Sequence, residues 1–340
     1  MKKAFISGIT GQDGAYLAQL LLSKGYEVTG GVRRSSLNSM FRLEALDLAQ
    51  KVELVSFDLS DPYNVIEIIS NGQYDEFYNL AAQSFVAASW DVPMQTADVD
   101  AIGVLRILEA IRKSSTHTKF YQASTSEMFG QIREPRQNEM TPFYPRSPYG
   151  VSKLFAHSMT VNYRESFQLH ASSGILFNHE SPLRGHEFVT KKITSELAKI
   201  ALGLKDTLFI GNLEARRDWG YAEEYVEGMW SMLQASTPDD FVLATGVCTS
   251  VKAFVEYSAQ SLGISIEWRG TGVDEVGYNK KNGKPVVVVD PKFYRPAEVD
   301  VLLGDASKAE AKLGWKPTIN VEQLCHMMVT HDYDLAKKSI

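Results

Sequence analysis

Short apolar segments alternate with amphipathic segments through the first half of the chain, and this alternation limits it to few folds. The apolar segments predict strands over 3–8, 27–32, 52–57, 76–80, 120–124 and 171–177. The segments with helical spacing predict helices over 13–24, 92–114 and 148–167. Because crossovers between parallel strands are right-handed, the pattern predicts an α/β fold, a doubly wound parallel sheet with helices on both faces.

After residue 178 the alternation becomes irregular. Helices are predicted over about 188–203, 222–235, 250–262, 306–313 and 320–337, and strands near 208–210, 241–244, 266–268 and 286–289. The Gly-, Asn- and Lys-rich stretch 270–284 is typical of a surface loop. We therefore predict two domains: residues 1–178 with a returning segment about 213–250, and a smaller C-terminal lobe of residues 179–212 and 251–340.

Composition excludes several classes of partner. The formal net charge is −6, from 35 basic and 41 acidic residues, and no block of Lys or Arg stands out. Nucleic acid and anionic membrane surfaces are therefore not expected as partners. The two cysteines, Cys248 and Cys325, lack the spacing of metal ligands, so we expect reduced thiols and no metal site. No apolar segment has the length of a membrane span, and the N-terminal one is too short for a signal peptide, so the expected location is cytoplasmic.

A glycine-rich turn, Gly8-Ile9-Thr10-Gly11-Gln12-Asp13-Gly14, separates the first predicted strand from the first predicted helix. Glycines at such a turn let the backbone approach a pyrophosphate at the helix N-terminus. The spacing is GxxGxxG, and any strand-to-helix turn favours glycine. The position after a strand and before a helix nevertheless predicts a dinucleotide-binding site.

Residues at the ends of the next strands indicate which dinucleotide binds. An NAD site places an acidic residue about 20 positions after the turn, but this chain has Arg33-Arg34-Ser35-Ser36 at the end of its second strand. Two arginines and two hydroxyls suit a 2′-phosphate, which favours NADP; the alternative is a solvated basic loop. Asp58-Leu59 and Leu80-Ala81-Ala82-Gln83-Ser84 follow the third and fourth strands, where ligands bind in such sheets.

The candidate catalytic residues form two groups. Tyr149 and Lys153 lie four residues apart at the start of a predicted helix, so that both side chains share one face. An ammonium beside a phenol favours the phenolate, which can take a proton from a substrate hydroxyl as hydride leaves. Thr125 and Glu127 follow the fifth strand; the hydroxyl could bind that substrate hydroxyl. The carboxylate could remove a proton α to the new ketone, although Ser126 and Glu127 could instead cap a helix.

Together these residues resemble the extended short-chain dehydrogenase/reductase superfamily, a Rossmann-fold group, and within it the GDP-mannose 4,6-dehydratase family. The resemblance extends from Gly8 to about Pro317. Besides the glycine turn and Arg33–Ser36, the specific stretches are Tyr121-Gln122-Ala123-Ser124-Thr125-Ser126-Glu127, Thr141-Pro142-Phe143-Tyr144-Pro145-Arg146-Ser147-Pro148-Tyr149, Phe177-Asn178-His179-Glu180-Ser181-Pro182, Arg217-Asp218-Trp219-Gly220 and Tyr294-Arg295-Pro296-Ala297-Glu298-Val299-Asp300.

The resemblance implies roles for individual residues. It implies that the catalytic residues are Thr125, Glu127, Tyr149 and Lys153. It implies NADP(H) contacts by Asp58, Leu59, Ala81, Gln83, Tyr149, Lys153, His179 and Arg184. It implies GDP-sugar contacts by Ser84, Asn178, Glu180, Lys192, Arg217, Arg295 and Glu298. Two departures stand out: Gln95 occupies a position where relatives can have a cofactor-binding Tyr, and Lys192 stands where Arg is usual.

The resemblance also implies the reaction, a redox-neutral dehydration of GDP-D-mannose to GDP-4-keto-6-deoxy-D-mannose with tightly bound NADP recycled in each turnover. It implies a homodimer or homotetramer in which the helices over 92–114 and 148–167 form the dimer interface. Three alternatives remain open: the same chemistry on a GDP-manno-heptose, another nucleotide-sugar epimerase or reductase, and a non-enzymatic NADP-binding sensor.

Overall fold

The computed structural model describes residues 1–34, 40–293 and 301–340. Ser35, Ser36, Arg295 and Glu298, four of the predicted site residues, lie outside these ranges. The chain divides into two compact units. The first comprises Met1–Phe177, Ala222–Leu243 and Gly304–Lys316, and the second comprises Asn178–Tyr221, Ala244–Leu303 and Pro317–Ile340.

The first unit is built on a seven-stranded sheet in which all pairs are parallel. In sheet order the strands are β10 (Asp240–Leu243), β6 (Ala171–Leu176), β5 (Lys119–Thr125), β4 (Glu76–Asn79), β1 (Lys3–Ser7), β2 (Glu27–Val32) and β3 (Glu53–Ser56). On one side of β1 the chain adds β2 and β3, and on the other side it adds β4, β5, β6 and β10, so the sheet is doubly wound as predicted. Ligands bind such sheets beyond the carboxyl ends of the strands, at the place where the strand order reverses, which is here between β1 and β4.

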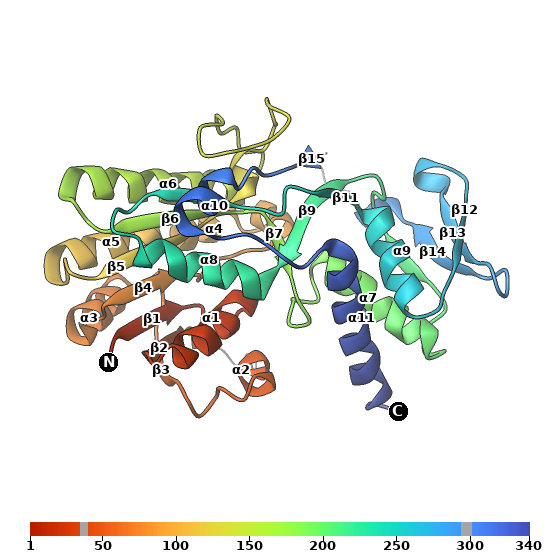
Figure 1. Ribbon diagram of the computed structural model, residues 1–340, viewed down its shortest axis with the longest axis horizontal. Helices are drawn as coiled ribbons and strands as arrows, with labels where there is room; N and C mark the ends of the chain where they lie inside the picture. Colours follow the sequence, from red (N-terminus) through yellow and green to blue (C-terminus); the bar gives the residue numbers. More distant parts are fainter. Residues whose placement is uncertain (35–39, 294–300) are drawn as a thin grey trace. The chain divides into compact units, whose positions relative to one another are not determined.

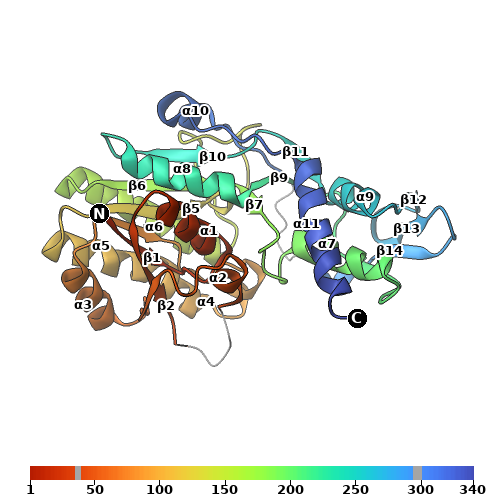
Figure 2. The same cartoon turned by 60° about the horizontal axis from the view of Figure 1, so that its bottom comes forward.

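Helices cover both faces of this sheet (Figures 1 and 2). On one face lie α3 (Pro62–Gly72), α5 (Gly103–Ser114) and α6 (Pro148–Phe167); on the other lie α1 (Gln12–Ser23) and α8 (Ala222–Gln234). The short helices are α2 (Phe41–Ala45), α4 (Pro93–Ala97) and α10 (Ser307–Leu313), of which α10 packs on α8 and β10. Aromatic side chains of the sheet pack in one core with α3 and α5. The rings of Phe5 and Phe77 are stacked there, with their centroids 4.8 Å apart.

Two helical features of the first unit differ from prediction. Helix α3 was not predicted, although Asp61 caps it by accepting hydrogen bonds from Tyr63 N and Asn64 N, with Pro62 at its first position. The predicted single helix over 92–114 is divided into α4, a π-helical turn η2 (Asp98–Ile102) and α5. The sequence analysis missed this turn because the segments on both sides of it keep helical spacing, so the whole range was predicted as one helix.

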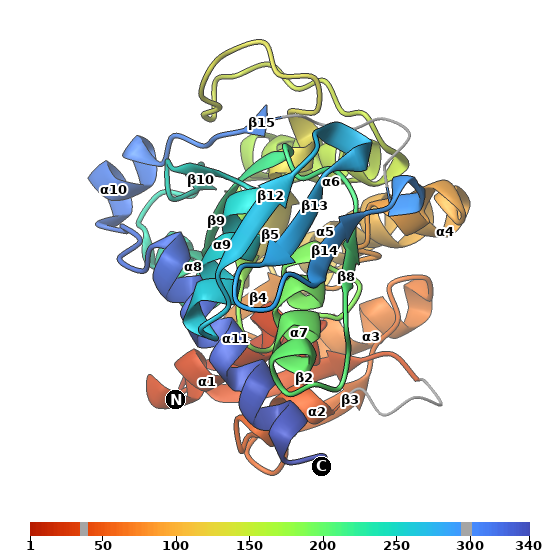
Figure 3. The same ribbon diagram turned by 90° about the vertical axis from the view of Figure 1, so that its right-hand side faces the viewer.

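The second unit contains two small sheets (Figure 3). One comprises β7 (Asn178–Glu180), β9 (Arg216–Tyr221), β11 (Cys248–Ser250) and β15 (Val301–Leu302); the other comprises β12 (Ile266–Arg269), β13 (Val276–Asn279), β14 (Pro285–Val289) and β8 (Leu208–Ile210). The prediction of a surface loop over 270–284 was therefore wrong. Strand β13 lies inside that range and pairs antiparallel with β12 and β14, although two of its four residues, Gly277 and Asn279, are of types that disfavour strands.

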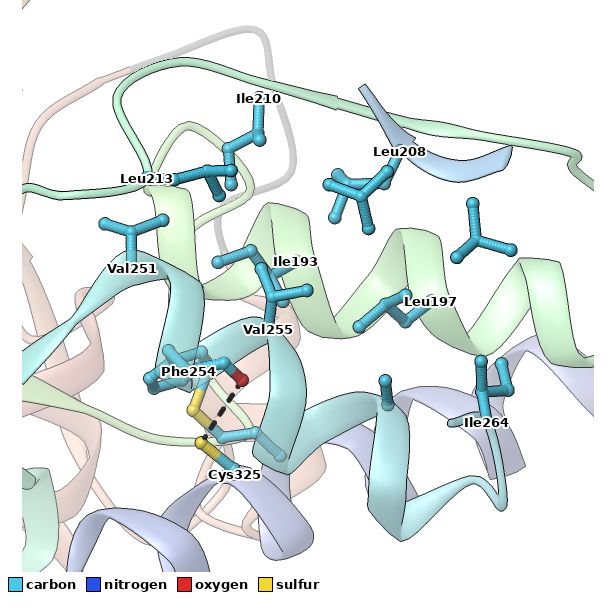
Figure 4. Packing of buried hydrophobic residues seen from close by; sticks show 14 of the residues in the cluster. Ile193, Leu197, Leu208, Ile210, Leu213, Val251, Phe254, Val255, Ile264 and Cys325 are labelled. Atoms are coloured by element: carbon cyan, nitrogen blue, oxygen red, sulfur yellow. Dashed lines mark hydrogen bonds between the residues drawn. The ribbon is translucent and has the colours of Figure 1, made fainter. Parts of the chain in front are cut away.

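Helices α7 (Val189–Ala201), α9 (Val251–Ser261) and α11 (Val321–Lys337) pack together in this unit. Their apolar side chains share a core (Figure 4), in which Ile193, Leu197 and Val255 are fully buried. The Cys325 thiol donates to Phe254 O at 3.8 Å inside this core. A buried ion pair between Lys191 and Asp332 also joins α7 to α11.

The division into units differs from the sequence-based one at two returning segments. The segment that completes the first unit's sheet is Ala222–Leu243, shorter than the predicted 213–250, because β9 and β11 pair with strands of the second unit. Gly304–Lys316 also belongs to the first unit, where Trp315 Nε1 donates to Glu224 O at 2.7 Å. No helix among the described residues combines the length and hydropathy needed to span a membrane.

Candidate active site

The glycine turn connects β1 to α1 and requires glycine at two positions. Gly8 has φ +72°, and a Cβ there would lie 2.9 Å from the backbone of Ala81. A Cβ on Gly14 would lie 2.4 Å from Gly8 O. Gly11 caps α1 without a side-chain hydrogen bond, so the helix begins with its dipole facing this bare backbone. The turn therefore suits an anionic group such as a pyrophosphate.

An arginine that sequence analysis missed supports this turn. Arg42, on α2, donates from Nη1 to Thr10 O at 3.1 Å. The signal was weak, because α2 is only five residues long and has too few residues to show a helical pattern. Arg42 thus adds a positive charge beside a turn already suited to an anion.

The ends of β2 and β3 bring a carboxylate near the predicted arginines. Asp58 Oδ1 accepts hydrogen bonds from Ser60 N at 2.9 Å and Ser60 Oγ at 2.7 Å. Burial acts to raise the pKa of Asp58, but these bonds and the charges of Arg33 and Arg106 outweigh it and lower that pKa. Arg106 also donates to Leu59 O at 2.6 Å, which fixes the backbone after β3. These interactions favour the ionised form of Asp58 and hold its carboxylate beside Ser60.

The segment after β4 is held in place by hydrogen bonds from its backbone N–H groups to side-chain oxygens. Ser7 Oγ accepts from Leu80 N at 3.1 Å and from Ala81 N at 3.2 Å. Gln83 N donates to Asp100 Oδ1 at 2.7 Å. The small side chains that the sequence placed here therefore lie on a fixed backbone next to Gly8.

The end of β5 and the start of α6 lie against one another. Thr125 Oγ1 accepts a hydrogen bond from Glu127 N at 3.2 Å, which starts the 3-10 turn η3 (Ser126–Met128). Ser147 Oγ caps α6 by accepting from Gly150 N at 3.0 Å. A Cβ on Gly150 would lie 2.9 Å from Glu127 O, so this glycine permits the close approach. Thr125 and Glu127 thus lie beside the first turn of α6.

Tyr149 and Lys153 extend from that first turn and are almost completely buried, at 8% and 3% exposure. The Lys153 Nζ atom lies 5.8 Å from the centroid of the Tyr149 ring and donates to Ala123 O at 3.0 Å. Burial lowers the pKa of Lys153, while the carboxylates of Asp100 and Asp13 act to raise it. The structure therefore brings together the four predicted catalytic residues at the carboxyl end of β5.

A buried histidine below this group was also missed. His157 Nδ1 lies 3.1 Å from Ser124 Oγ, and burial lowers the pKa of this imidazole. His157 follows Lys153 by four residues on the same helix face, and that spacing could have identified it. This contact holds the side chain of Ser124, the residue before Thr125.

The predicted residues of the second unit lie on β7, α7 and β9. Glu180, on β7, is 1% exposed; it accepts from Thr190 Oγ1 at 2.5 Å and forms an ion pair with Arg184 at 2.9 Å. The Lys192 Nζ atom lies 3.4 Å from the ring centroid of Phe293, which sequence analysis did not select. Arg217 is buried on β9, and Asn178 and His179 both lie on β7.

A metal centre receives no support from the part of the chain that the structure describes. No group of three or more His, Cys, Asp or Glu side chains in these ranges is arranged to hold a metal ion.

The doubly wound sheet, with the glycine turn after β1 and the Tyr149–Lys153 pair on α6, has the fold of the extended short-chain dehydrogenases/reductases. A solved structure of UDP-glucose 4-epimerase from Thermotoga maritima shares this fold, with a TM-score of 0.81 at 22% identity over 99% of each chain. The family model described as GDP-mannose 4,6 dehydratase matches residues 5–328.

Curated relatives are similar over almost their whole length. The chain is 54% identical to GDP-mannose 4,6-dehydratase of Sinorhizobium fredii (strain HH103), over 97% of this chain and 96% of the relative. It is 50% identical to GDP-mannose 4,6 dehydratase of Homo sapiens, over 98% and 92%. This chain belongs to the GDP-mannose 4,6-dehydratase family.

Proposed function

We propose that this protein converts GDP-D-mannose to GDP-4-keto-6-deoxy-D-mannose by redox-neutral loss of water. The observation that carries the proposal is the pair Tyr149 and Lys153 buried beside Glu127 at the end of β5. An oxidation needs only the first two residues and a hydroxyl. A carboxylate at the same place adds the means to remove and return a second proton.

Tyr149 acts as the base in the first step. The Lys153 ammonium favours the phenolate, which accepts the proton of the C4 hydroxyl as hydride leaves C4. Thr125 orients that hydroxyl through its Oγ1 atom. Burial of both Tyr149 and Lys153 keeps bulk water away and strengthens the electrostatic effect of the ammonium.

Glu127 performs the elimination. The C4 ketone acidifies the C5 proton, which the Glu127 carboxylate takes; the resulting carboxylic acid then protonates the departing C6 hydroxyl. Water leaves and the Glu127 carboxylate is ionised again, so it takes a proton from solvent and passes it to C5. Tyr149 releases to solvent the proton that it took from the C4 hydroxyl, which returns both side chains to their starting state. Because the C4 oxidation is balanced by reduction at C6, the sugar gains or loses no electrons overall.

The cofactor of this proposal is NADP, held tightly and recycled in each turnover. When bound, its nicotinamide accepts the C4 hydride and returns a hydride to C6. The glycine turn fits its pyrophosphate, because the backbone is bare at the start of α1. A Cβ at Gly8 or Gly14 would clash with neighbouring backbone atoms and change this turn. Arg33 and Arg34 suit a 2′-phosphate. Ser35 and Ser36 are proposed to join them, and Asp58, Leu59, Leu80–Ser84, His179 and Arg184 to contact the remainder.

Removing the two arginines tests the choice of NADP over NAD. The variant Arg33→Ala/Arg34→Ala is expected to weaken NADPH binding about tenfold or more while NADH binding changes less than twofold, because only NADPH has a 2′-phosphate. Titration of cofactor fluorescence measures both dissociation constants. Lys24→Ala, which removes a cation near Trp230, is the control and should change neither. Equal losses for both cofactors would contradict the assignment.

The second unit supplies the proposed contacts to the GDP portion. Asn178, Lys192 and Arg217 are proposed to bind it, together with Ser84 of the first unit and with Arg295 and Glu298 of the undescribed segment. Arginine forks suit the diphosphate and a carboxylate suits the ribose hydroxyls. Glu180, whose carboxylate already bonds Thr190 and Arg184, is proposed to position Arg184 rather than to touch the sugar nucleotide.

Proton NMR of the purified protein with GDP-D-mannose tests the function directly. A new C6 methyl doublet without net NADPH absorbance is the expected result, and its appearance without added NADP⁺ would indicate a retained cofactor. NADPH accumulation without a methyl signal would indicate a plain dehydrogenase. Turnover of a GDP-manno-heptose but not GDP-D-mannose would instead favour the first alternative substrate.

We also propose that the protein is a homo-oligomer whose dimer interface includes α5 and α6. Val151 and Phe155, on α6, are 55% and 38% exposed, and Trp90 and Ile102 are also exposed on neighbouring segments. Such apolar side chains on adjacent helices favour burial against a second copy. Whether the complete assembly is a dimer or a tetramer stays open.

Charges on that face are expected to separate the subunits. Val151→Asp/Phe155→Asp should give a monomer of half or less the mass of the native assembly, because two carboxylates cannot be buried unpaired. Light scattering after size exclusion measures the mass. Leu204→Asp, at an equally exposed apolar residue of the second unit, should leave the mass unchanged. A monomeric native protein would contradict the proposal.

A further inference from the structure

Two consecutive side chains in the first turn of α7 bind the segment that follows β7. Thr190 Oγ1 donates to the Glu180 carboxylate at 2.5 Å, and that carboxylate forms the 2.9 Å ion pair with Arg184 Nε. Lys191 Nζ donates to Pro182 O at 2.8 Å. Helix α7 therefore holds this short segment twice, at the Arg184 side chain through Glu180 and at the backbone through Lys191.

The segment after β7 is itself a compact turn. Leu183 N donates to Ser181 Oγ at 3.0 Å, and Arg184 N donates to Ser181 O at 3.1 Å. The guanidinium carbon of Arg184 lies 3.5 Å from the ring centroid of Phe188, close enough for a cation–π contact. Because the turn is closed by its own hydrogen bonds, a contact that fixes Pro182 O also fixes the backbone of Arg184.

Lys191 is buried, and its charge is compensated by the C-terminal helix. Lys191 is 3% exposed, and its ammonium forms an ion pair with Asp332 of α11, which is 4% exposed. Thr194, one turn further along α7, donates to the other carboxylate oxygen of Asp332 at 2.6 Å. A buried ammonium without such a partner would be costly. Asp332 therefore keeps the Lys191 ammonium inside the protein, where it reaches Pro182 O.

Apolar contacts already join α7 to α11, which lie side by side (Figure 3). Ile193 and Leu197 of α7 and Leu324 and Met328 of α11 are buried in one shared core. Replacing a buried ion pair with apolar residues of similar volume is often neutral or stabilising. An apolar pair, however, has no donor for Pro182 O. The ion pair thus serves the placement of that backbone rather than the packing of the two helices.

We propose that Lys191 and Asp332 are positioning residues for the cofactor. Asp332 holds the Lys191 ammonium, the ammonium holds Pro182 O, and the turn fixed in this way keeps Arg184 in place to bind the anionic cofactor. This inference rests on the proposed function, which assigns Arg184 to NADP(H). It deepens that function, because it makes the C-terminal helix α11 necessary for tight cofactor binding.

The paired variant Lys191→Met/Asp332→Asn tests the proposal, because it removes both charges and the donor to Pro182 O without adding volume. The NADPH dissociation constant is expected to rise about tenfold, since Arg184 is no longer held ready for the ligand. Cofactor fluorescence measures it. Binding of GDP alone, measured by calorimetry, should change less than twofold, because its proposed contact Lys192 lies against Phe293 instead.

The variant Arg184→Ala tests whether the pair acts through this arginine. Alone it is expected to weaken NADPH binding about tenfold or more, because it removes a fork suited to a phosphate. Combined with the paired variant it should cause less than a twofold further loss, because residues that act as one unit are not additive. Fully additive losses, or native NADPH binding by Arg184→Ala, would overturn the proposal.

Two variants separate position from stability, with circular dichroism and melting temperature to show folding. Leu324→Ala removes a buried side chain of α11 outside the pair, so it should lower the melting temperature and leave NADPH binding within twofold of native. Thr194→Val keeps both charges and removes only the 2.6 Å hydrogen bond to Asp332. It should weaken NADPH binding about threefold even if the paired variant does not fold. Native NADPH binding by Thr194→Val would contradict the proposal.

Failure of the proposed function gives a different result. If the native protein forms no methyl product from GDP-D-mannose, the proposed function fails. Binding of NADPH and of GDP requires no turnover, so the two dissociation constants still decide this inference. Weaker NADPH binding with native GDP binding in the paired variant supports it, whereas equal losses for both ligands, or no loss for either, would overturn it.

Discussion

Replacing Tyr149 with phenylalanine is expected to lower kcat on GDP-D-mannose by about 10³-fold, because general base catalysis contributes roughly 10²–10⁴ to such rates. The substitution removes one oxygen from a ring that is 8% exposed and leaves the packing of α6 intact. Lys153 keeps its hydrogen bond to Ala123 O, so the ammonium stays in place without a phenol to act on.

Proton NMR measures the rate through the C6 methyl doublet, and cofactor fluorescence shows whether NADPH binding is retained. The expected binding change is less than about threefold, which is under 1 kcal/mol. Tyr144→Phe is the matched control: Tyr144 is exposed, lies five residues earlier, and should retain wild-type kcat. A Tyr149→Phe variant with kcat within tenfold of wild type would assign the base to another residue.

Glu127→Gln is expected to block loss of water while C4 oxidation continues. An amide cannot take the C5 proton or protonate the C6 hydroxyl, so formation of the methyl product should fall by about 10²–10⁴-fold. The hydrogen bond from Glu127 N to Thr125 Oγ1 that starts η3 does not involve the Glu127 carboxylate, so the turn should persist. The variant should therefore fold and bind cofactor as the native protein does.

Exchange with D₂O distinguishes this role from a general loss of activity. Native protein should place solvent deuterium at C5 of the product, whereas the variant should leave the C5 proton of recovered substrate unexchanged. Glu165→Gln, at an exposed position of α6, serves as the control with unchanged exchange. Near-native turnover by Glu127→Gln would remove this residue from the elimination step.

Local patterns allowed much of the first unit to be predicted. The strands β1 to β6 and helices α1 and α6 follow from apolar runs and helical spacing, which are properties of short segments. The glycine turn is partly local: a Cβ on Gly14 would meet Gly8 and Ile9 of the same turn, whereas a Cβ on Gly8 would meet Ala81, far along the chain. The roles given to Thr125, Glu127, Tyr149 and Lys153 stay predictions, although the structure places these residues together.

Distant contacts account for what sequence reasoning missed. Strand β13 contains Gly277 and Asn279, whose residue types disfavour strands, yet it pairs with two neighbouring strands. Thr190 and Arg184 hold the carboxylate of Glu180, two contacts that the sequence analysis did not foresee, and the predicted contact of Glu180 with the sugar nucleotide stays a prediction. The buried carboxyl of Asp100 was missed as well, because the Gln83 N–H group that bonds it lies 17 residues away in the chain.

The sequence by itself therefore determined the parallel sheet, the glycine turn and the spacing of Tyr149 and Lys153, because periodicity and turn conformation depend on near neighbours. The tertiary structure alone decided how β13 pairs with its neighbours and which segments return to the first unit. Those outcomes depend on burial and on pairing between residues that only folding brings together, and no local pattern records them.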